Sequence, residues 1–405
     1  MFPDFIKVTV KKRDDVTQNM VKKAKLTSPT MAAAKGEKRS SSIADQIAEL
    51  ENEIANTKYN KRTQHHVGLV KAKIAQLREK QQLRQKQSSG PGDGYAVRKT
   101  GDGTVVLLGF PSAGKSTLLN ALTNQESEVG SYAFTTLSVI PGILEYGHAK
   151  IQILDVPGIV EGAAKGTGRG KEVLQVIRNA DLIVRLVDVF TPDHYHKINK
   201  EVADVNVRMN QKDPDVKIVK TGKGGIDIGA TVRLTKIDFE TVEDIMKSFK
   251  IMNAQVVIRD DITPDELIDS IMKNCVYVPA ITVLNKIDMA DTKTLRRAQD
   301  SVEPDVMVSA KEGTNMEKLK RLIFERLSLM RLYLKEVSKK ADMEEPLIIR
   351  EGSTLRDLCA KLHKDFVKKF RFARVWGGSA RFDGQKIRKL DHVLADEDVV
   401  ELHIS

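Results

Sequence analysis

Apolar residues in the first part of the chain recur at spacings of three and four, the period of an amphipathic helix. One stripe consists of Ile43, Ile47, Leu50 and Ile54, and a second consists of Val67, Val70, Ile74 and Leu77. Ser42, followed three residues later by Asp45, can cap the first helix. A break near Tyr59 and Asn60 lets the helices fold back on each other. Residues 41–87 therefore predict an antiparallel helical hairpin.

Two segments without periodicity flank this hairpin. Residues 1–40 predict a poorly ordered basic extension, within which Met31 is a second candidate translation start. The run Ser88-Ser89-Gly90-Pro91-Gly92 predicts a flexible linker over residues 88–100. His65 and His66 lie at the bend of the hairpin with no carboxylate or Cys beside them in the sequence, so they do not predict a metal site.

From residue 101 the pattern changes to short apolar runs that alternate with helical stretches. This alternation is typical of a parallel sheet with crossover helices. Near residue 341 it changes again, with strands expected over 346–350, 372–376 and 399–404 and a helix over 354–369. The sequence therefore predicts an α/β domain over residues 101–340, followed by a small separate α+β domain over residues 341–405.

A phosphate-binding loop follows the first of these strands. After the apolar run 105–108, residues 109–116 have the pattern G-x-x-x-x-G-K-S, and a helical stretch begins at Thr117. In that setting the loop N–H groups and the helix N-terminus bind the β-phosphate, the Lys spans the β- and γ-phosphates, and the Ser hydroxyl binds Mg²⁺. The expected nucleotide contacts are Gly109, Pro111, Ser112, Ala113, Gly114, Lys115, Ser116 and Thr117. Lys115 is also expected to act in catalysis.

A second phosphate-binding segment follows the apolar run 151–154. Asp155 and Gly158 form the pattern D-x-x-G, 40 positions after Lys115. The Asp contributes to the magnesium shell and the Gly N–H meets the γ-phosphate. Upstream, Thr135 or Thr136 supplies a further magnesium ligand, and the sequence does not distinguish between them. We expect Thr136 and Gly158 to take part in catalysis.

Two segments fit the guanine-reading pattern [N/T]-K-x-D, residues 235–238 and residues 285–288. Only the second, with Asn285, Lys286 and Asp288, follows a strongly apolar run, so we assign the motif there. Asp288 can accept hydrogen bonds from N1–H and the 2-amino group of guanine, and ATP would leave this carboxylate unpaired, which can discriminate by roughly 10⁴. The segment Ser309-Ala310-Lys311 matches the loop that closes over the base.

The position after the D-x-x-G glycine holds Ile159. Many GTPases place a glutamine there to orient the attacking water. Isoleucine cannot form a hydrogen bond, so hydrolysis requires another group, a cation or a partner. Arg169, in the glycine-rich segment 161–171, is a candidate for contacting the γ-phosphate. The alternative is that Arg169 only orders that segment. We predict a GTPase that converts GTP to GDP and phosphate with slow intrinsic turnover.

Charge is concentrated in the first quarter of the chain. Residues 1–100 carry 21 Lys and Arg against 10 Asp and Glu, whereas the rest has 45 of each, so the net charge of +11 resides in this arm. Such an arm suits a polyanion; we expect the ribosome or rRNA, and we do not expect DNA. The alternative is a solvated helical arm whose lysines serve only solubility.

Cysteine content and hydropathy bear on location. Cys275 and Cys359 are far apart and suggest no disulfide framework, which is typical of a reducing compartment. The most apolar run, residues 276–284, is far shorter than the roughly 18 residues of a membrane span. The N-terminus lacks the pattern of a secretory signal. We expect a cytoplasmic protein without a membrane partner.

Together these motifs resemble those of the developmentally regulated GTP-binding proteins (DRG), a branch of the Obg-related TRAFAC GTPases with a C-terminal TGS domain. The resemblance rests on residues 109–116, Phe134-Thr135-Thr136-Leu137, residues 155–159, Gly168-Arg169-Gly170-Lys171 and residues 285–288. It extends to His65-His66-x-Gly-Leu in the hairpin and Ala373-x-Val-Trp376-Gly377 near the C-terminus. It covers residues 41–405.

The resemblance implies a helix-turn-helix, a P-loop GTPase G domain, a ribosomal-protein-like α/β insertion within it, and a TGS domain with a ubiquitin-like β-grasp. From Asp155 to Asn285 is 130 positions, where a βαβ unit needs roughly 30, and we place the insertion at about 191–275. The resemblance also implies action on translating ribosomes and a regulatory partner protein. Some related GTPases bind a catalytic K⁺ through an Asn where this chain has Ser112, so K⁺ dependence stays open.

The last domain interleaves basic and aromatic residues. The basic residues are Lys368, Lys369, Arg371, Arg374, Arg381, Lys386, Arg388 and Lys389, and the aromatic residues are Phe366, Phe370, Phe372, Trp376 and Phe382. RNA-binding surfaces have this composition, but alternating apolar residues also suit a half-buried strand. We expect most of the aromatic rings to lie in the core and the basic side chains to form the contact surface.

Two functions compete with a ribosome- or RNA-associated switch in translation. A GTPase linked to a membrane or the cytoskeleton would bring the basic arm to anionic lipid, but the apolar stripes of the arm are narrow and lack Trp and Phe. A nucleotide-dependent scaffold with negligible hydrolysis is disfavoured because Lys115, Ser116 and Asp155 are all present.

Overall fold

The two N-terminal apolar stripes form helices that pack on each other. The computed structural model describes residues 42–58, 60, 63–88, 101–123, 140–156 and 176–404, so the predicted extension and nearly all of the predicted linker lie outside it. The helices are α1 (Ile43–Asn56) and α2 (Gln64–Ser88). A capping box starts α1: Ser42 N–H donates to the Asp45 carboxylate at 3.0 Å, and Asp45 N–H donates to Ser42 Oγ at 3.1 Å. Ile47, Val70 and Ile74 are buried between the helices.

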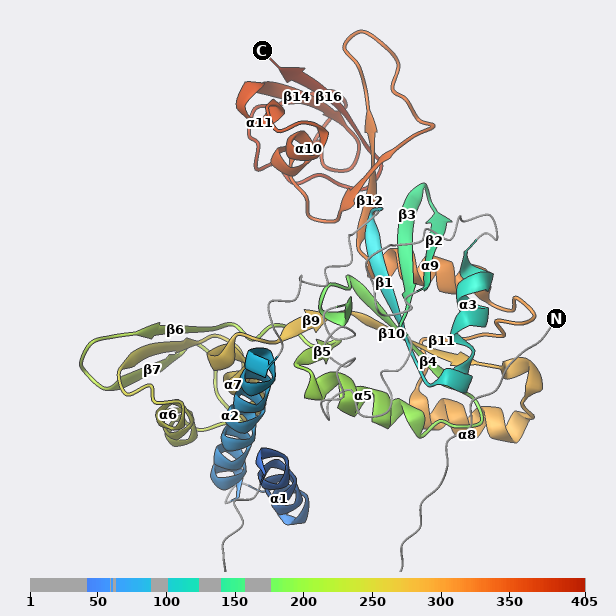
Figure 1. The fold of residues 1–405 in the computed structure, drawn as a ribbon. Helices are drawn as coiled ribbons and strands as arrows, with labels where there is room; N and C mark the ends of the chain where they lie inside the picture. Colours follow the sequence, from blue (N-terminus) through green and yellow to red (C-terminus); the bar gives the residue numbers. More distant parts are fainter. Residues whose placement is uncertain are drawn as a thin grey trace, which may run out of the picture.

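A six-stranded sheet with the strand order β11-β10-β4-β1-β3-β2 forms the centre of the molecule (Figure 1). Its strands are β1 (Gly103–Leu108), β2 (Ile140–Tyr146), β3 (Ala149–Asp155), β4 (Leu182–Asp188), β10 (Ala280–Asn285) and β11 (Val306–Met307). Neighbouring strands are parallel, except that β2 is antiparallel to β3. This confirms the predicted α/β fold with a mostly parallel central sheet.

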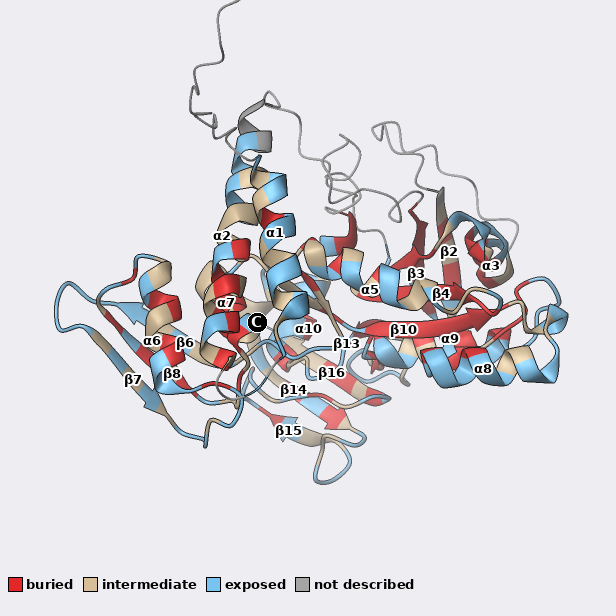
Figure 2. Cartoon of the chain, turned by 90° about the horizontal axis from the view of Figure 1, so that it is seen from below, coloured by how far each residue is buried: buried red, intermediate tan, exposed pale blue. Residues whose placement is uncertain are grey.

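Helices cover both faces of this sheet. They are α3 (Lys115–Leu122), α5 (His194–Asp204), α8 (Thr292–Val302) and α9 (Met316–Arg326). Successive residues of β1 point to opposite faces. Val105 and Leu107 pack with α3 and α9, whereas Val106 and Leu108 pack with α5. Figure 2 shows the strands of this sheet as buried, which explains why they occur in the sequence as apolar runs without alternation.

A second, smaller α/β unit lies between β4 and β10. Its elements are β5 (Val207–Met209), β6 (Val216–Lys220), β7 (Ile226–Ala230), α6 (Phe239–Ser248), β8 (Ala254–Ile258), α7 (Pro264–Met272) and β9 (Val276–Val278). β6, β8 and β7 form a three-stranded sheet packed against α6 and α7, and β5 pairs with β9. The helix α5 falls inside the predicted insertion of residues 191–275, but it packs on the central sheet.

The hairpin also packs against this unit, a contact that the sequence did not indicate. In Figure 1, α2 lies beside α6 and α7. Ala72 of α2 is buried in the core that these helices form. Lys71 Nζ lies 2.5 Å from the carboxylate of Asp265, and His65 Nε2 lies 2.7 Å from the carboxylate of Asp244. The hairpin is thus fixed to the second unit by apolar contact and by ion pairs.

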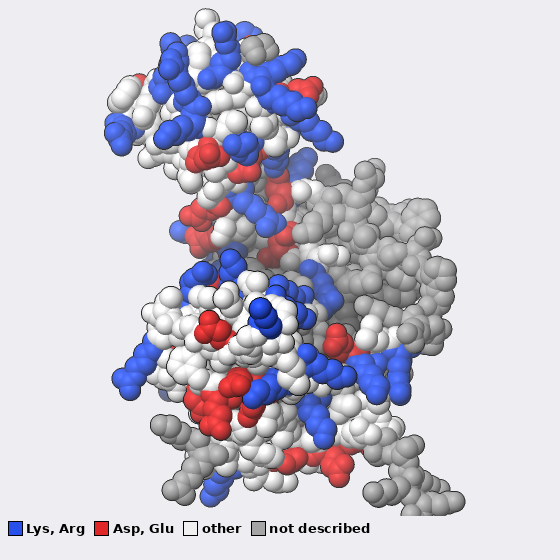
Figure 3. All heavy atoms as spheres, turned by 90° about the vertical axis from the view of Figure 1, so that its left-hand side faces the viewer, with Lys and Arg blue, Asp and Glu red and all other residues white. Residues whose placement is uncertain are grey.

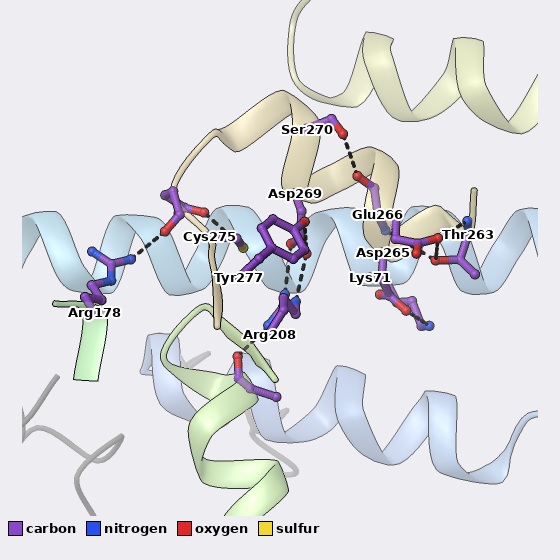
Figure 4. Close-up of polar contacts among 12 residues, drawn as sticks. Lys71, Arg178, Arg208, Thr263, Asp265, Glu266, Asp269, Ser270, Cys275 and Tyr277 are labelled. Carbon is purple, nitrogen blue, oxygen red and sulfur yellow. Dashed lines mark hydrogen bonds and ion pairs between the residues drawn. The ribbon is translucent and has the colours of Figure 1, made fainter. Parts of the chain in front are cut away.

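A buried ion pair joins α7 to β5 (Figure 4). Arg208 Nε and Nη2 each donate to Asp269 at 2.8 Å, and Arg208 Nη1 donates to the carbonyl oxygen of Ala203, in α5, at 2.9 Å. Burial raises the pKa of the neighbouring Cys275 thiol to about 12. The cluster therefore links α5 to the second unit, and its thiol stays protonated and unreactive at pH 7.

The C-terminal part of the chain forms a five-stranded sheet with the order β13-β12-β16-β14-β15. Its elements are β12 (Leu329–Leu334), β13 (Leu347–Arg350), α10 (Leu355–Leu362), α11 (Phe366–Lys369), β14 (Phe370–Trp376), β15 (Gln385–Ile387) and β16 (Asp398–Ile404). α10 packs on one face, where Leu358 contacts the core formed with Ala373 and Val375. The arrangement agrees with the expected β-grasp.

Two details of this region differ from the sequence prediction. β12 pairs with β13 and β16, so the sheet begins before the predicted boundary at residue 341. An apolar run that follows a helix looks the same in the sequence whichever sheet it joins. The helix expected over residues 354–369 is two helices, interrupted at His363. Among the described residues, no helix has both the length and the apolarity to cross a membrane.

Candidate functional site

The phosphate loop lies between β1 and α3, as its pattern predicts. A 3₁₀ turn, η1 (Pro111–Ala113), leads to Gly114, which has φ +90°. A Cβ on Gly114 would lie 2.6 Å from the side-chain nitrogen of Asn285, and a Cβ on Gly109 would lie 2.7 Å from a backbone oxygen of β4. Both positions therefore require glycine for conformation or close approach. Pro111, Ser112, Ser116 and Thr117 are exposed.

Lys115 lies in this loop with 6% of its surface exposed. Its Nζ is 3.4 Å from the carbonyl oxygen of Phe110. Burial lowers the pKa of Lys115, and the charge of Asp155 acts in the opposite direction. The ammonium group is thus close to one carboxylate in a poorly solvated site, a position that favours binding of further negative charge.

Asp155, at the end of β3, faces the first turn of α3. Ser116 Oγ donates to Asp155 Oδ2 at 3.0 Å. Asp155 Oδ1 is buried and has no hydrogen-bond partner among the residues that the structure describes. A buried carboxylate oxygen without a partner, next to a hydroxyl, fits the oxygen ligands that Mg²⁺ prefers. The donor set is therefore compatible with the magnesium ion predicted for these two residues.

Asn285, at the end of β10, connects the phosphate loop to the base-reading segments. Its Nδ2 donates to the carbonyl oxygen of Ala113 at 2.9 Å, and its Oδ1 accepts from Ala310 N–H at 3.1 Å. Lys286 adopts a left-handed backbone conformation with φ 66°, and its Nζ lies 2.6 Å from Asp188 at the end of β4. Motifs that are 172 positions apart thus meet through one side chain.

The residues predicted to contact the base differ in their exposure. Asp288 and Lys311 are exposed, whereas Ser309 and Ala310 are buried. Ser309 Oγ accepts from Glu312 N–H at 3.1 Å, which holds the turn of this loop. The segments 285–288 and 309–311 lie at the carboxyl ends of β10 and β11, and this is the edge at which parallel α/β sheets bind ligands.

The alternative motif at residues 235–238 has a different environment. Asp238 caps α6, and its carboxylate accepts from Thr241 N–H at 2.7 Å. The Thr235 hydroxyl donates to Asp261 at 2.5 Å, and the Lys236 carbonyl accepts from Gln64 of the hairpin. These side chains hold the second unit together, away from the phosphate loop.

Several predicted site residues lie outside the described residues. They are Thr135, Thr136, Gly158, Ile159 and Arg169. Their assignments stay predictions from the sequence. Conversely, two residues beside these motifs were not predicted: Asp188, which binds Lys286, and His194, whose ring stacks on Phe110 of the phosphate loop. Asp188 ends a buried parallel strand, a position that could have marked it as a site residue, whereas His194 has no distinguishing pattern.

Four features together define a P-loop GTPase. They are the strand order, the phosphate loop at the β1–α3 junction, the facing Ser116 and Asp155, and the Asn-Lys-x-Asp segment. Family models agree. Residues 104–221 match a family described as 50S ribosome-binding GTPase, residues 223–329 match the C-terminal region of that GTPase domain, and residues 330–404 match the TGS domain.

The chain belongs to the family of developmentally regulated GTP-binding proteins. It is 40% identical to developmentally-regulated GTP-binding protein 2 of Bos taurus, over 89% of this chain and 99% of the relative. It is 50% identical to an uncharacterized GTP-binding protein of Methanocaldococcus jannaschii, over 89% of this chain and 93% of the relative. Among solved structures, the Schizosaccharomyces pombe YchF GTPase matches with a TM-score of 0.43 and 13% identity, over 76% of this chain and 99% of that one.

Proposed function

We propose that this GTPase acts as a switch on the ribosome, with RNA as its contact. The observation that carries the proposal is the surface formed by residues 366–390 of the C-terminal region, which combines exposed cations with partly exposed aromatic rings. The match of residues 104–221 to a family described as 50S ribosome-binding GTPase points the same way. A role on ribosomes implies a cytoplasmic location.

Contrary to expectation, none of the aromatic residues of this region is fully buried, although Phe370 packs against the core of the sheet. Phe366, Phe370, Phe372 and Trp376 are only partly buried, and Phe382 is 65% exposed. The Phe372 ring stacks on His403 with centroids 4.1 Å apart, and Lys386 Nζ lies 3.8 Å from the same ring. Lys335 Nζ lies 4.7 Å from the Trp376 ring centroid. The core of this sheet is aliphatic instead, because α10 covers only one face.

The basic residues of the same region are all exposed. Residues 366–390 contain eight Lys and Arg and one acidic residue, Asp383. Figure 3 shows Lys and Arg side chains gathered on the lobe that β12 to β16 form. Cations bind phosphates and position an RNA chain, while rings and planar side chains stack on unpaired bases. This surface offers both kinds of group.

The hairpin contributes less free charge than its composition suggests. Arg78 of α2 binds Glu51 at 2.6 Å and Asp204 at 3.0 Å, and Lys71 binds Asp265. These two cations are paired within the molecule. The C-terminal surface is therefore the stronger candidate for RNA contact among the described residues.

We also propose that Ser116 and Asp155 hold Mg²⁺ when nucleotide binds. The ion would supply positive charge at the β- and γ-phosphates. Lys115 adds a second positive charge, and the loop N–H groups orient the phosphates for attack by water. The test is magnesium-dependent GTP binding. Asp155→Asn should lose most of the magnesium dependence, and an unchanged dependence would refute the assignment.

Ribosome co-sedimentation tests the main proposal. The full-length protein, loaded with a non-hydrolysable GTP analogue, is sedimented with ribosomes at several salt concentrations. A triple charge reversal of Arg371, Arg374 and Lys386 to Glu should abolish co-sedimentation. The matched control reverses Lys293, Arg296 and Arg297, which are exposed on α8, and should bind as wild type does. Wild-type protein that fails to sediment with ribosomes, or two triple variants that bind alike, would overturn the proposal.

A further inference from the structure

The first residue of α5 lies against the phosphate loop. The imidazole ring of His194 stacks on the phenyl ring of Phe110, with centroids 3.6 Å apart and 17° between the ring planes. Phe110 is the second residue of the loop, directly after Gly109. The two rings come from the loop after β1 and the helix after β4, and the parallel pairing of these strands brings them together.

The backbone around His194 fixes the orientation of its ring. His194 Nδ1 lies 3.1 Å from Thr191 Oγ1, and its N–H donates to the carbonyl oxygen of Thr191 at 3.2 Å. Thr191 N–H in turn donates to the carbonyl oxygen of Asp188 at 3.0 Å. Asp188 ends β4 and binds Lys286 of the base-reading motif. The ring is therefore held by a turn that starts at the rigid end of a central strand.

Phe110 matters to the loop because its carbonyl oxygen shapes the turn. That oxygen accepts from Ala113 N–H at 3.0 Å, and Lys115 Nζ lies 3.4 Å from it. The ring and the carbonyl group share one Cα, so fixing the ring restricts the peptide as well. Burial lowers the pKa of His194, and Lys197 acts in the same direction. The ring is therefore neutral at pH 7 and stacks through its π face.

We propose that His194 is a positioning residue for nucleotide binding: its stack on Phe110 holds the phosphate loop in the conformation that receives the phosphates. A loop that is already ordered loses less conformational entropy on binding, so the nucleotide binds more tightly. His194 touches the loop and acts through it. This inference concerns the nucleotide site alone and does not depend on ribosome binding.

Nucleotide affinity of single variants tests the proposal. The dissociation constant for fluorescent GDP is measured for wild type, His194→Ala, His194→Gln and His194→Phe. Loss of the His194 ring should raise the dissociation constant about 3- to 10-fold, which corresponds to the free energy that an aromatic pair contributes. His194→Phe should restore it to within about twofold. The control is His196→Ala, since His196 is exposed on the same helix and contacts the ring of Tyr195 instead.

A double-mutant cycle assigns the effect to the stack. If His194 acts through Phe110, adding His194→Ala to Phe110→Ala should have little further effect on affinity. Additive losses would overturn the proposal. Wild-type nucleotide affinity in both His194→Ala and His194→Gln would also overturn it. The same holds if His194→Phe binds nucleotide as weakly as His194→Gln does. Because Gln and Phe variants are compared with each other, the test stands even if His194→Ala does not fold.

Discussion

Asn285 holds Ala113 of the phosphate loop by a hydrogen bond of 2.9 Å between Nδ2 and the carbonyl oxygen. The same side chain accepts from Ala310 N–H. One amide therefore sets the spacing between the phosphate loop and the two segments that are predicted to contact the base. Both of its partners are buried backbone groups, so neither can turn to water instead.

We predict that Asn285→Ala lowers both stability and nucleotide affinity. The variant leaves a buried carbonyl and a buried N–H without partners, at about 1–3 kcal/mol each. Urea denaturation and GDP binding measure the two effects. Asn285→Thr should be milder, because its hydroxyl can satisfy one of the two groups. Equal stability of wild type and Asn285→Ala would contradict this role.

Guanine selectivity should reside in Asp288. Asp288→Asn should weaken GTP binding and favour xanthosine triphosphate, whose 2-oxo group accepts a hydrogen bond where guanine donates one. The change in preference should be on the order of 10⁴. The matched control is Asp238→Asn, because Asn can still cap α6. A xanthine preference in the control variant would move the base-reading site to residues 235–238.

Lys115→Ala should bind GTP roughly 10- to 100-fold more weakly, the free energy of a hydrogen bond to a charged group. The physical reason is that its buried ammonium group, which interacts with Asp155, supplies positive charge within the phosphate loop. Equilibrium titration with fluorescent GTP measures the loss. Hydrolysis at the wild-type rate in this variant would contradict the assignment of the whole site.

The Arg208–Asp269 ion pair should be important for stability. The side chains are only 18% and 7% exposed, and removing one partner of a buried pair costs about 3–5 kcal/mol. Arg208→Met should therefore unfold at markedly lower urea concentration. Lys212→Met is the control, since its side chain is 79% exposed and its pairing with Asp260 lies on the surface. Similar urea midpoints for the two variants would show that burial does not govern the effect.

Intrinsic hydrolysis should be slow and should rise on the ribosome. Ile159 cannot orient water, and a supplied arginine can be worth roughly 10³–10⁵ in rate. Single-turnover hydrolysis, with and without ribosomes, is compared for wild type, Ile159→Gln and Arg169→Ala. We expect ribosomes to stimulate wild type and Arg169→Ala to reduce the stimulation. Fast hydrolysis by the isolated wild type, unchanged in Arg169→Ala, would show that another residue positions the water.

The class of this protein could be predicted from contiguous sequence motifs, which also mark its candidate nucleotide site. The phosphate loop, the Asp155 segment and the Asn285 segment are each contiguous, and each directly follows an apolar strand of the central sheet. Their chemistry depends on local backbone geometry, which a short run of residues can specify. The same holds for the capping box at Ser42 and for the amphipathic stripes of α1 and α2.

Which distant side chains meet could be established only from the folded structure. Four features join segments that are far apart in the chain. They are the packing of α2 on α6 and α7, the pairing of β12 with β16, the partly exposed rings around Phe372, and the stack of His194 on Phe110. No local pattern marks such contacts, because an apolar or aromatic residue is suited equally to a core, an interface or an open sheet face. Which of these it occupies depends on what packs against it, and that is set by the arrangement of whole elements.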